Sequence, residues 1–233
     1  MIKLIKANER HFFKTDWLQT YWHFSFDHYY DPNNMNWGNI RVFNDDIIKP
    51  KSGFDFHPHR DMEIITFIIS GELTHRDNLG NEGVIKSGDI QRMTAGRGII
   101  HSERNEHSDE PVHLLQMWVL PDQSGLDPSY DEKHFDITER LNKLLTVVSN
   151  SKHPYSLHIN QDVTFYVSKL EESIEIAHLT DKERYLYLYT IDGELQVNDV
   201  ELSKADSLKI HGEEIINFKT KSKADFLLID CNG

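Results

Sequence analysis

Two short motifs in this chain carry side chains that bind divalent metal ions. His57 and His59 flank Pro58, and His101 and Glu103 follow as a second pair with the same spacing. Alternate side chains of a β-strand leave the same face, and two residues of rise span roughly 6.6 Å. Two imidazoles so placed can converge on one ion at metal–nitrogen distances of about 2.1 Å. The residue types and their spacing therefore predict a metal site built on β-strands.

The sequence around the two pairs strengthens this prediction. About one His-x-His pair is expected by chance among 14 histidines in 233 residues, so the pairs gain meaning only from their context. Gly96 and Gly98 permit sharp backbone bends just before His101. Between the pairs, the β-branched and aromatic run 63–70 predicts a buried strand, and Ser70-Gly71-Glu72 predicts a hairpin after it.

Short β-type runs alternate with Gly, Asn and Asp turns along most of the chain. We expect strands at residues 39–44, 63–70, 83–86, 113–120, 164–170, 185–191 and 224–230. Residues 136–147 are the best candidate for a short helical or irregular connector. Many short strands with turn signals between them predict an all-β sandwich or barrel.

A weak internal repeat predicts the domain organisation. Residues 67–73 (FIISGEL) resemble residues 189–195 (YTIDGEL), which indicates a shortened second copy of one barrel. We therefore expect two tandem β-barrels, one in residues 1–140 and the other in residues 141–233. Residues 149–154 look like part of the connection between them.

The second copy does not repeat the metal ligands. Counting from the repeated glycines and turns, the positions equivalent to the three histidines hold Leu179, Asp181 and Phe218. We therefore expect one metal ion per chain, in the N-terminal barrel only.

Composition limits the class of partner and the compartment. The chain has 25 basic and 38 acidic residues, a formal net charge of −13, which argues against nucleic acid or an anionic membrane as a main partner. The single cysteine, Cys231, excludes an internal disulfide and favours the cytoplasm. No apolar stretch approaches the roughly 18 residues of a membrane span. We expect a soluble cytoplasmic protein.

Taken together, these motifs resemble the cupin superfamily and, within it, the pirin family. The first cupin motif is matched by His57, His59, Glu63 and Gly71, and the second by Gly88, Gly96, His101 and Asn105. The blocks at 53–60, 71–77, 93–103 and 113–118 look like those of pirins. Residues 29–32 and 44–46 look like the bacterial pirin-like quercetinases. The resemblance implies an all-β bicupin with two jelly-roll barrels.

The resemblance leaves two choices for the fourth ligand. The general cupin pattern assigns it to Glu63, whereas the pirin pattern assigns it to Glu103, and spacing by itself permits both. We follow the pirin pattern, whose ligand set in this chain is His57, His59, His101 and Glu103. The implied ion is Fe(II), with Mn, Ni, Co, Cu or Zn as alternatives.

The activity implied by the resemblance is flavonol 2,3-dioxygenation. In this reaction O₂ opens quercetin, and CO and a depside are released; Glu103 would act as metal ligand and as base for the substrate hydroxyl. His75, Gln116 and Trp118 could lie close to the site or its mouth. The alternative is a non-enzymatic, metal-dependent regulatory or redox-sensing pirin that acts through protein partners. A cupin isomerase with the same ligands is a third reading.

Overall fold

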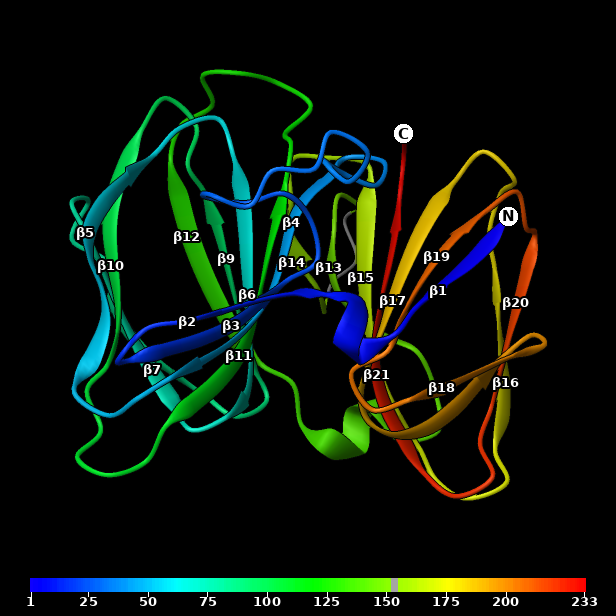
Figure 1. The fold of residues 1–233 in the computed structure, drawn as a ribbon. Coiled ribbons are helices and arrows are strands. Elements are labelled where there is room, and N and C mark those ends of the chain that lie inside the picture. The colour runs from blue at the N-terminus through cyan, green and yellow to red at the C-terminus, as the bar shows by residue number, and fades with distance from the viewer. Residues whose placement is uncertain (152–154) are drawn as a thin grey trace.

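The computed structural model describes residues 1–151 and 155–233 of the chain. These residues form β-strands β1 to β21 and two short 3₁₀ turns, η1 (Ala7–Glu9) and η2 (Ile137–Arg140), with no α-helix among them. The strands build two barrels that lie side by side (Figure 1). The prediction of an all-β chain with two tandem barrels is confirmed.

The first barrel consists of a large and a small sheet. The large sheet has the strand order β12-β9-β6-β11-β4-β3-β2, and the small sheet has the order β5-β10-β7-β8. The strands of the large sheet are β2 (His11–Lys14), β3 (Leu18–Trp22), β4 (Ile40–Ile48), β6 (Glu63–Ser70), β9 (Asp89–Thr94), β11 (Val112–Val119) and β12 (Ser129–His134). The strands of the small sheet are β5 (Ser52–His59), β7 (Glu72–Asp77), β8 (Glu82–Lys86) and β10 (Ile99–Asn105).

The second barrel is one continuous set of hydrogen-bonded strands. Its main path is β1-β19-β17-β21-β15-β13-β14, while β16, β18 and β20 branch from it through β17. The strands are β1 (Ile2–Ile5), β13 (Leu145–Ser149), β14 (Leu157–His158), β15 (Val163–Leu170), β16 (Glu175–Leu179), β17 (Tyr185–Val197), β18 (Val200–Ser203), β19 (Ser207–His211), β20 (Ile215–Lys219) and β21 (Ala224–Cys231).

The first strand of the chain belongs to the second barrel. Strand β1 pairs antiparallel with β19, with Ile2 opposite Ile210 and Leu4 opposite Leu208. Figure 1 shows this blue strand beside the orange strands of the second barrel. The division after residue 140 stays a prediction, and of the predicted connection 149–154 the last three residues lie outside the described part.

The predicted hairpin at Gly71 is wrong. Strand β7 does not pair with β6; it pairs with β10 and β8 in the opposite sheet. The reason is that β6 already has a partner on each edge, β9 and β11, so the chain must cross over and help close the barrel. Gly71 makes this turn with a φ of +81°, a conformation that favours glycine.

The internal repeat is visible in the backbone. Gly193 has a φ of +83°, close to that of Gly71. A Cβ at Gly71 would meet the carbonyl oxygen of Pro111, and one at Gly193 would meet that of Lys223, each just before the neighbouring strand. The same residue type is therefore required at both positions for the same steric reason.

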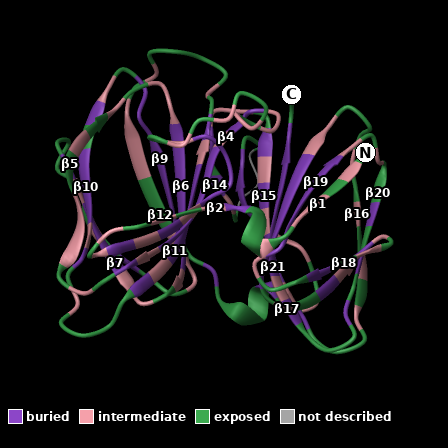
Figure 2. Ribbon diagram, in the orientation of Figure 1, coloured by how far each residue is buried: buried purple, intermediate pink, exposed green. Residues whose placement is uncertain are grey.

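The largest hydrophobic core lies between the barrels. Phe43, Phe67 and Met117 of the first barrel pack in one cluster with Phe165 and Tyr187 of the second. Figure 2 shows buried positions concentrated along the strands that face the junction.

The predicted connector 136–147 contains the 3₁₀ turn η2 and then enters β13. Of the two forms predicted for it, helical or irregular, the structure shows a mainly irregular segment.

Candidate metal centre

Strands β5 and β10 bring the three predicted histidines together. His57 lies directly opposite His101 in the antiparallel pair, and His59 lies opposite Ile99. The ring centroids are 4.4 Å apart for His57 and His101, 4.8 Å for His57 and His59, and 4.9 Å for His59 and His101. Their ring nitrogens form a group in which all ligand atoms lie within 4.8 Å of one another. The structure thus brings together the three imidazoles that the spacing argument paired.

The nitrogen atoms of this group are available to a metal. His101 is 1% exposed, and neither of its ring nitrogens has a hydrogen-bond partner among the described residues. The Nδ1 atom of His57 lies 2.7 Å from the carbonyl oxygen of Asp55, which leaves Nε2 for another ligand. A buried polar atom without a partner is costly, so the unpaired nitrogens of His101 fit a site that holds a cation.

Burial keeps two of these imidazoles, those of His59 and His101, neutral. It lowers the pKa of His59 to about 4 and the pKa of His101 to about 4, and in both rings the neighbouring histidines act in the same direction. Only the neutral imidazole has a lone pair to donate to a metal. Both rings can therefore donate a lone pair to a cation at neutral pH.

Glu103 lies on β10, two residues after His101, and shares that histidine with the first group. It is 2% exposed, and its carboxylate groups with His75 and His101 as a second set of ligand atoms. Burial alone would raise the pKa of Glu103, but the charges of His101 and His75 and a hydrogen bond from Gln116 together hold it below its ordinary value. A register shift between His101 and Glu103 marks a bulge in β10.

A row of polar residues across the large sheet faces Glu103. The amide Nε2 of Gln116 donates to Glu103 Oε2 at 2.7 Å, and Trp118 Nε1 donates to Gln116 Oε1 at 3.2 Å. Thr66 and Gln91 reach Glu103 Oε1 at longer distances of 3.5 Å. Asn44, Gln116, Thr66 and Gln91 lie directly opposite one another on four neighbouring strands.

Glu63, the alternative ligand, contacts a different part of the molecule. Its carboxylate accepts hydrogen bonds from Thr94 Oγ1 at 3.0 Å and from Asn160 Nδ2 at 3.1 Å. Asn160 precedes β15 of the second barrel, so Glu63 joins the two barrels. Burial raises its pKa. Its oxygens belong to neither group of ligand atoms in the described chain.

His75 is more deeply placed than its sequence suggests. It is 0% exposed on β7, its ring stacks on Tyr130 at 4.4 Å, and its Nε2 lies 3.4 Å from Asp77 Oδ2. Its Nδ1 has no partner among the described residues. The His-x-Asp spacing of His75 and Asp77 was present in the sequence, but surface pairs share it, so spacing alone could not single it out.

A cavity of about 270 Å³ opens onto His57, His59 and Glu103. Its walls are rich in aromatic side chains contributed by several separate segments, namely Phe13, Trp17, Trp22, Phe26, Phe54 and Trp118. The remaining lining includes two polar residues of β4, Asn44 and Asp46. The sequence did not indicate this wall, because its residues come from segments that are far apart along the chain.

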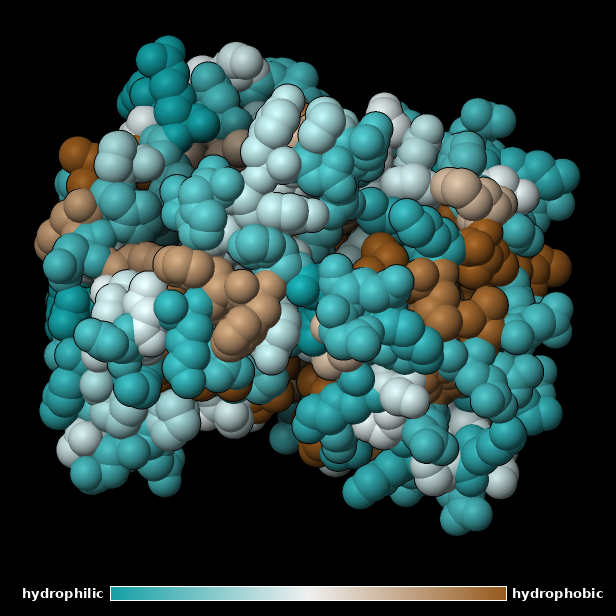
Figure 3. All heavy atoms as spheres, in the orientation of Figure 1, coloured by the Kyte–Doolittle hydropathy of each residue, from teal (hydrophilic) through white to brown (hydrophobic). Residues whose placement is uncertain are grey.

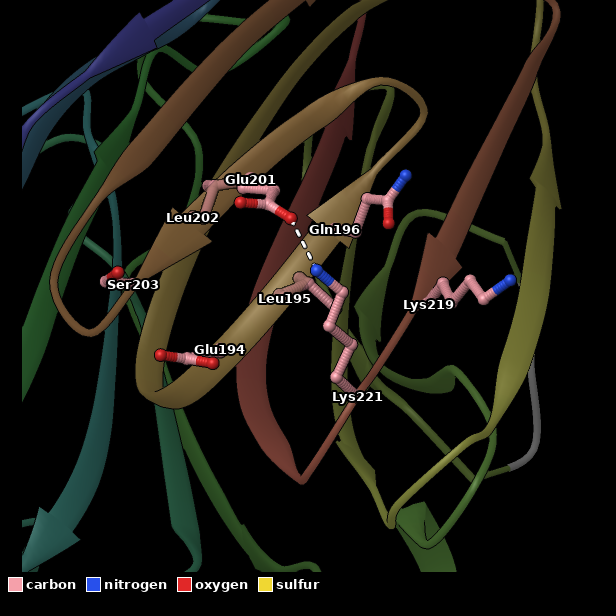
Figure 4. A pocket seen from close by; sticks show the side chains of 8 residues that line it. All are labelled: Glu194, Leu195, Gln196, Glu201, Leu202, Ser203, Lys219 and Lys221. Atoms are coloured by element: carbon pink, nitrogen blue, oxygen red, sulfur yellow. Dashed lines mark hydrogen bonds and ion pairs between the residues drawn. The ribbon is translucent and has the colours of Figure 1, made fainter.

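The second barrel has a pocket of another kind. Figure 4 shows it beside the β17–β18 hairpin, where the Lys221 ammonium donates to Glu201 at 2.8 Å. Histidine is absent from the residues that line it. Both groups of ligand atoms found in the described part of the chain come from the first barrel.

Known proteins share both halves of this arrangement. Residues 5–119 match the family described as Pirin, and residues 146–231 match the family described as quercetinase C-terminal cupin domain. The chain is 39% identical to a quercetin 2,3-dioxygenase of Escherichia coli over 99% of its own length and 98% of that protein. It is 41% identical to a pirin-like protein of Caulobacter vibrioides, covering 92% and 93% of the two chains.

Solved structures agree with these relatives. The bacterial pirin YhhW of Escherichia coli, in complex with nickel(II), superposes with a TM-score of 0.95 and 37% identity, covering 100% of this chain and 99% of that one. Two cupin barrels in tandem, with a histidine and glutamate cluster inside the first, define a bicupin. The chain belongs to the pirin family, as its motifs predicted.

The names of the relatives also bear on the predicted class of protein. The prediction of a quercetinase-like oxidoreductase is confirmed at the level of the family, because full-length curated relatives are named quercetin 2,3-dioxygenase.

Within the described residues, the structure has no helix with the length and apolar character needed to cross a membrane.

Proposed function

We propose that this chain is a metal-dependent dioxygenase that opens flavonols such as quercetin with O₂, releasing CO and a depside. The observation that carries the proposal is the aromatic cavity of about 270 Å³ that ends on His57, His59 and Glu103. A flat aromatic substrate matches such walls, and the cavity leads it to the proposed ion. The nickel-bound relative and the relatives named quercetin 2,3-dioxygenase support the same reaction.

The proposed ligands are His57, His59, His101 and Glu103, for one divalent ion in the first barrel. Three neutral imidazoles and one carboxylate suit Fe(II), our first choice, and equally Mn, Ni, Co, Cu or Zn. A bound ion would supply the positive charge that stabilises the deprotonated hydroxyl of the substrate and the redox partner for O₂. The orphaned nitrogens of His101 support this assignment.

Glu103 is proposed as the acceptor of the proton from the substrate's 3-hydroxyl. Its lowered pKa keeps it ionised at neutral pH, and Gln116 holds one oxygen through a hydrogen bond of 2.7 Å. The other oxygen, Oε1, has only two long contacts of 3.5 Å. That oxygen is the one that remains available to a metal or to a proton.

The proposal is tested by metal removal. Protein stripped by a chelator should lose the ability to consume quercetin, and readdition of Fe(II) or Ni(II) should restore it, with one CO released for each quercetin consumed. Full activity in the stripped protein would overturn the proposal. A metal-loaded protein that binds one ion but releases no CO would favour the regulatory pirin that acts through protein partners.

A second experiment decides the fourth ligand. Glu103→Gln and Glu63→Gln are compared for metal content after identical purification. We expect Glu103→Gln to lose most of its metal, whereas Glu63→Gln keeps it, because Glu63 is bound by Thr94 and Asn160. The opposite result would assign the role of fourth ligand to Glu63.

The cytoplasm stays our proposed location, in keeping with one cysteine and a net charge of −13.

A further inference from the structure

One wall of the cavity carries polar atoms that nothing in the described chain satisfies. Asn44 and Asp46 on β4 are each 3% exposed. The Oδ1 atom of each side chain has no hydrogen-bond partner among the described residues. Both residues line the cavity that ends on the proposed metal ligands. Buried polar atoms of this kind are normally paired, so their common position calls for an explanation.

The alternation of β4 separates these two side chains from the residue between them. Asp45 points toward the second barrel, where Arg10, His113 and Tyr189 bind its carboxylate at 3.0, 2.6 and 2.7 Å. Asp46 takes part in no ion pair of the described chain. Asp45 thus has a structural role at the junction. Asp46 makes no comparable set of contacts in the described chain.

The strand register orders the wall from the proposed metal outward. Asn44 lies directly opposite Gln116, which is hydrogen-bonded to Glu103. Asp46 lies opposite Leu114, two residues further along the strand and therefore roughly 6.6 Å away from Asn44. The cavity consequently has a polar point near the ligands and a second one farther along the same wall.

We propose that Asn44 and Asp46 anchor the hydroxyl groups of the substrate's side ring and so select flavonols that are hydroxylated there. This inference rests on the proposed function and adds a specificity role to residues that are not metal ligands. The aromatic walls accept the faces of the rings, and the two polar side chains bind groups on the ring edge. A substrate without hydroxyls there leaves the buried oxygens unpaired, which is the condition under which binding sites discriminate strongly.

The protonation of Asp46 agrees with this role. Burial, reinforced by the charges of Asp45 and Glu103, raises its pKa to about 7 and outweighs the effect of the Thr20 hydroxyl. Near neutral pH the side chain can therefore accept a hydrogen bond from a phenol or donate one to it.

The test varies two things together: the side chain at position 46 and the hydroxyl groups on the side ring of the flavonol. Asp46→Ala and wild-type protein, both metal-loaded, are assayed with quercetin and with galangin, which has the same flavonol core without hydroxyls on its side ring. We expect kcat/KM for quercetin to fall about 10- to 100-fold, mainly through KM, and that for galangin to change less than about threefold. Asp46→Asn should recover part of the loss, because an amide also binds hydroxyls. Asp199→Asn, an exposed turn position in the second barrel, is the control.

Binding without turnover keeps this inference separate from the proposed function. Nickel-loaded protein in the absence of O₂ is titrated with each flavonol, and dissociation constants are measured by fluorescence quenching. A selective loss of quercetin affinity in Asp46→Ala supports the anchor even if wild-type protein releases no CO. Equal losses for both flavonols, or no loss for either, would overturn it. Metal content is measured in every variant, and Asn44→Ala provides an independent second position if Asp46→Ala does not fold.

Discussion

The two barrels share a fold but fill their interiors differently. The second barrel is packed with apolar side chains, among them Leu186, Leu195, Ile216, Phe218 and Phe226. Figure 3 shows strongly hydrophobic residues gathered over this barrel beside β1. In the first barrel, the apolar residues that do not belong to the junction form two smaller clusters, and residues of both line the cavity beside Glu103.

The difference shows which positions decide the role of a cupin barrel. By sequence counting, Phe218 stands where the first barrel has His101. His101 pairs with His57 across the strands, whereas Phe218 pairs with Ile176. Apolar side chains at such a position stabilise the fold through burial. Imidazoles there give up part of that stability and offer lone pairs that could bind a cation.

The largest effect is expected from removing the imidazole that is most buried. His101→Ala should abolish stoichiometric metal and reduce quercetin consumption below detection, because the ligand set loses a member that nothing replaces. Metal content is measured on freshly purified protein. His158→Ala, an exposed histidine of the second barrel, is the control and should keep its metal. Metal retained by His101→Ala would mean that the ligand set is wrongly assigned.

The matched change in the second barrel should affect stability instead. Phe218 is 0% exposed and stacks on Phe226 with ring centroids 5.1 Å apart. Phe218→Ala should lower the free energy of unfolding by about 3–5 kcal/mol. Urea denaturation gives this value, and the folded protein should still bind one metal ion. Lost metal in a folded Phe218→Ala protein would show that the barrels are not separable in role.

The pH dependence of the metal-free protein sharpens the comparison further. The folded pKa values of His59 and His101, both about 4, lie below the ordinary value of 6.5. Between pH 6.5 and 4 the unfolded chain therefore binds protons that the folded chain does not, so stability falls as the pH falls. For His101 this loss is at most about 3 kcal/mol.

Urea midpoints between pH 7 and 4.5 measure this effect. His101→Gln should show a flatter dependence than the wild-type protein. The pKa of His23, buried at the junction of the barrels, is lowered mainly by burial as well, so part of the slope remains in the variant. Identical slopes for the two proteins would contradict the lowered pKa of His101.

The smallest effect is expected at the pocket of the second barrel. Lys221 and Glu201 form an ion pair there, with side chains 73% and 72% exposed (Figure 4). Solvent screens such a pair strongly. Lys221→Met should leave metal content, quercetin consumption and the urea midpoint unchanged. A clear loss of activity would give this pocket a function that the comparison of the barrels does not assign to it.

The sequence predicted the strands and the histidine group because both depend on local patterns. Short β-type runs indicated β6, β11 and β21, and the i, i+2 spacing indicated the group of imidazoles. Strand parity was a poor guide for Glu63, because β6 belongs to a different sheet from β5, and a side chain's face cannot be carried across that turn.

Apart from Gln116, the polar row around Glu103 was not predicted from the sequence, for a related reason. Asn44, Thr66, Gln91 and Gln116 come from four strands and meet only through the register of their pairing. A shift of one residue in any of these strands would turn its side chain to the other face. Register is a property of the folded sheet, so no local sequence motif predicts it.

The pairing of β1 with β19 has a consequence for how the chain assembles on the ribosome. Its first strand emerges early, but the residues that it binds are synthesised roughly two hundred positions later. Until β19 has been synthesised, β1 has no partner strand, and its apolar residues Ile2 and Leu4 remain exposed to solvent. We expect the earliest strand made to be among the last to dock, and a fragment cut after residue 140 to carry an orphan strand at its start.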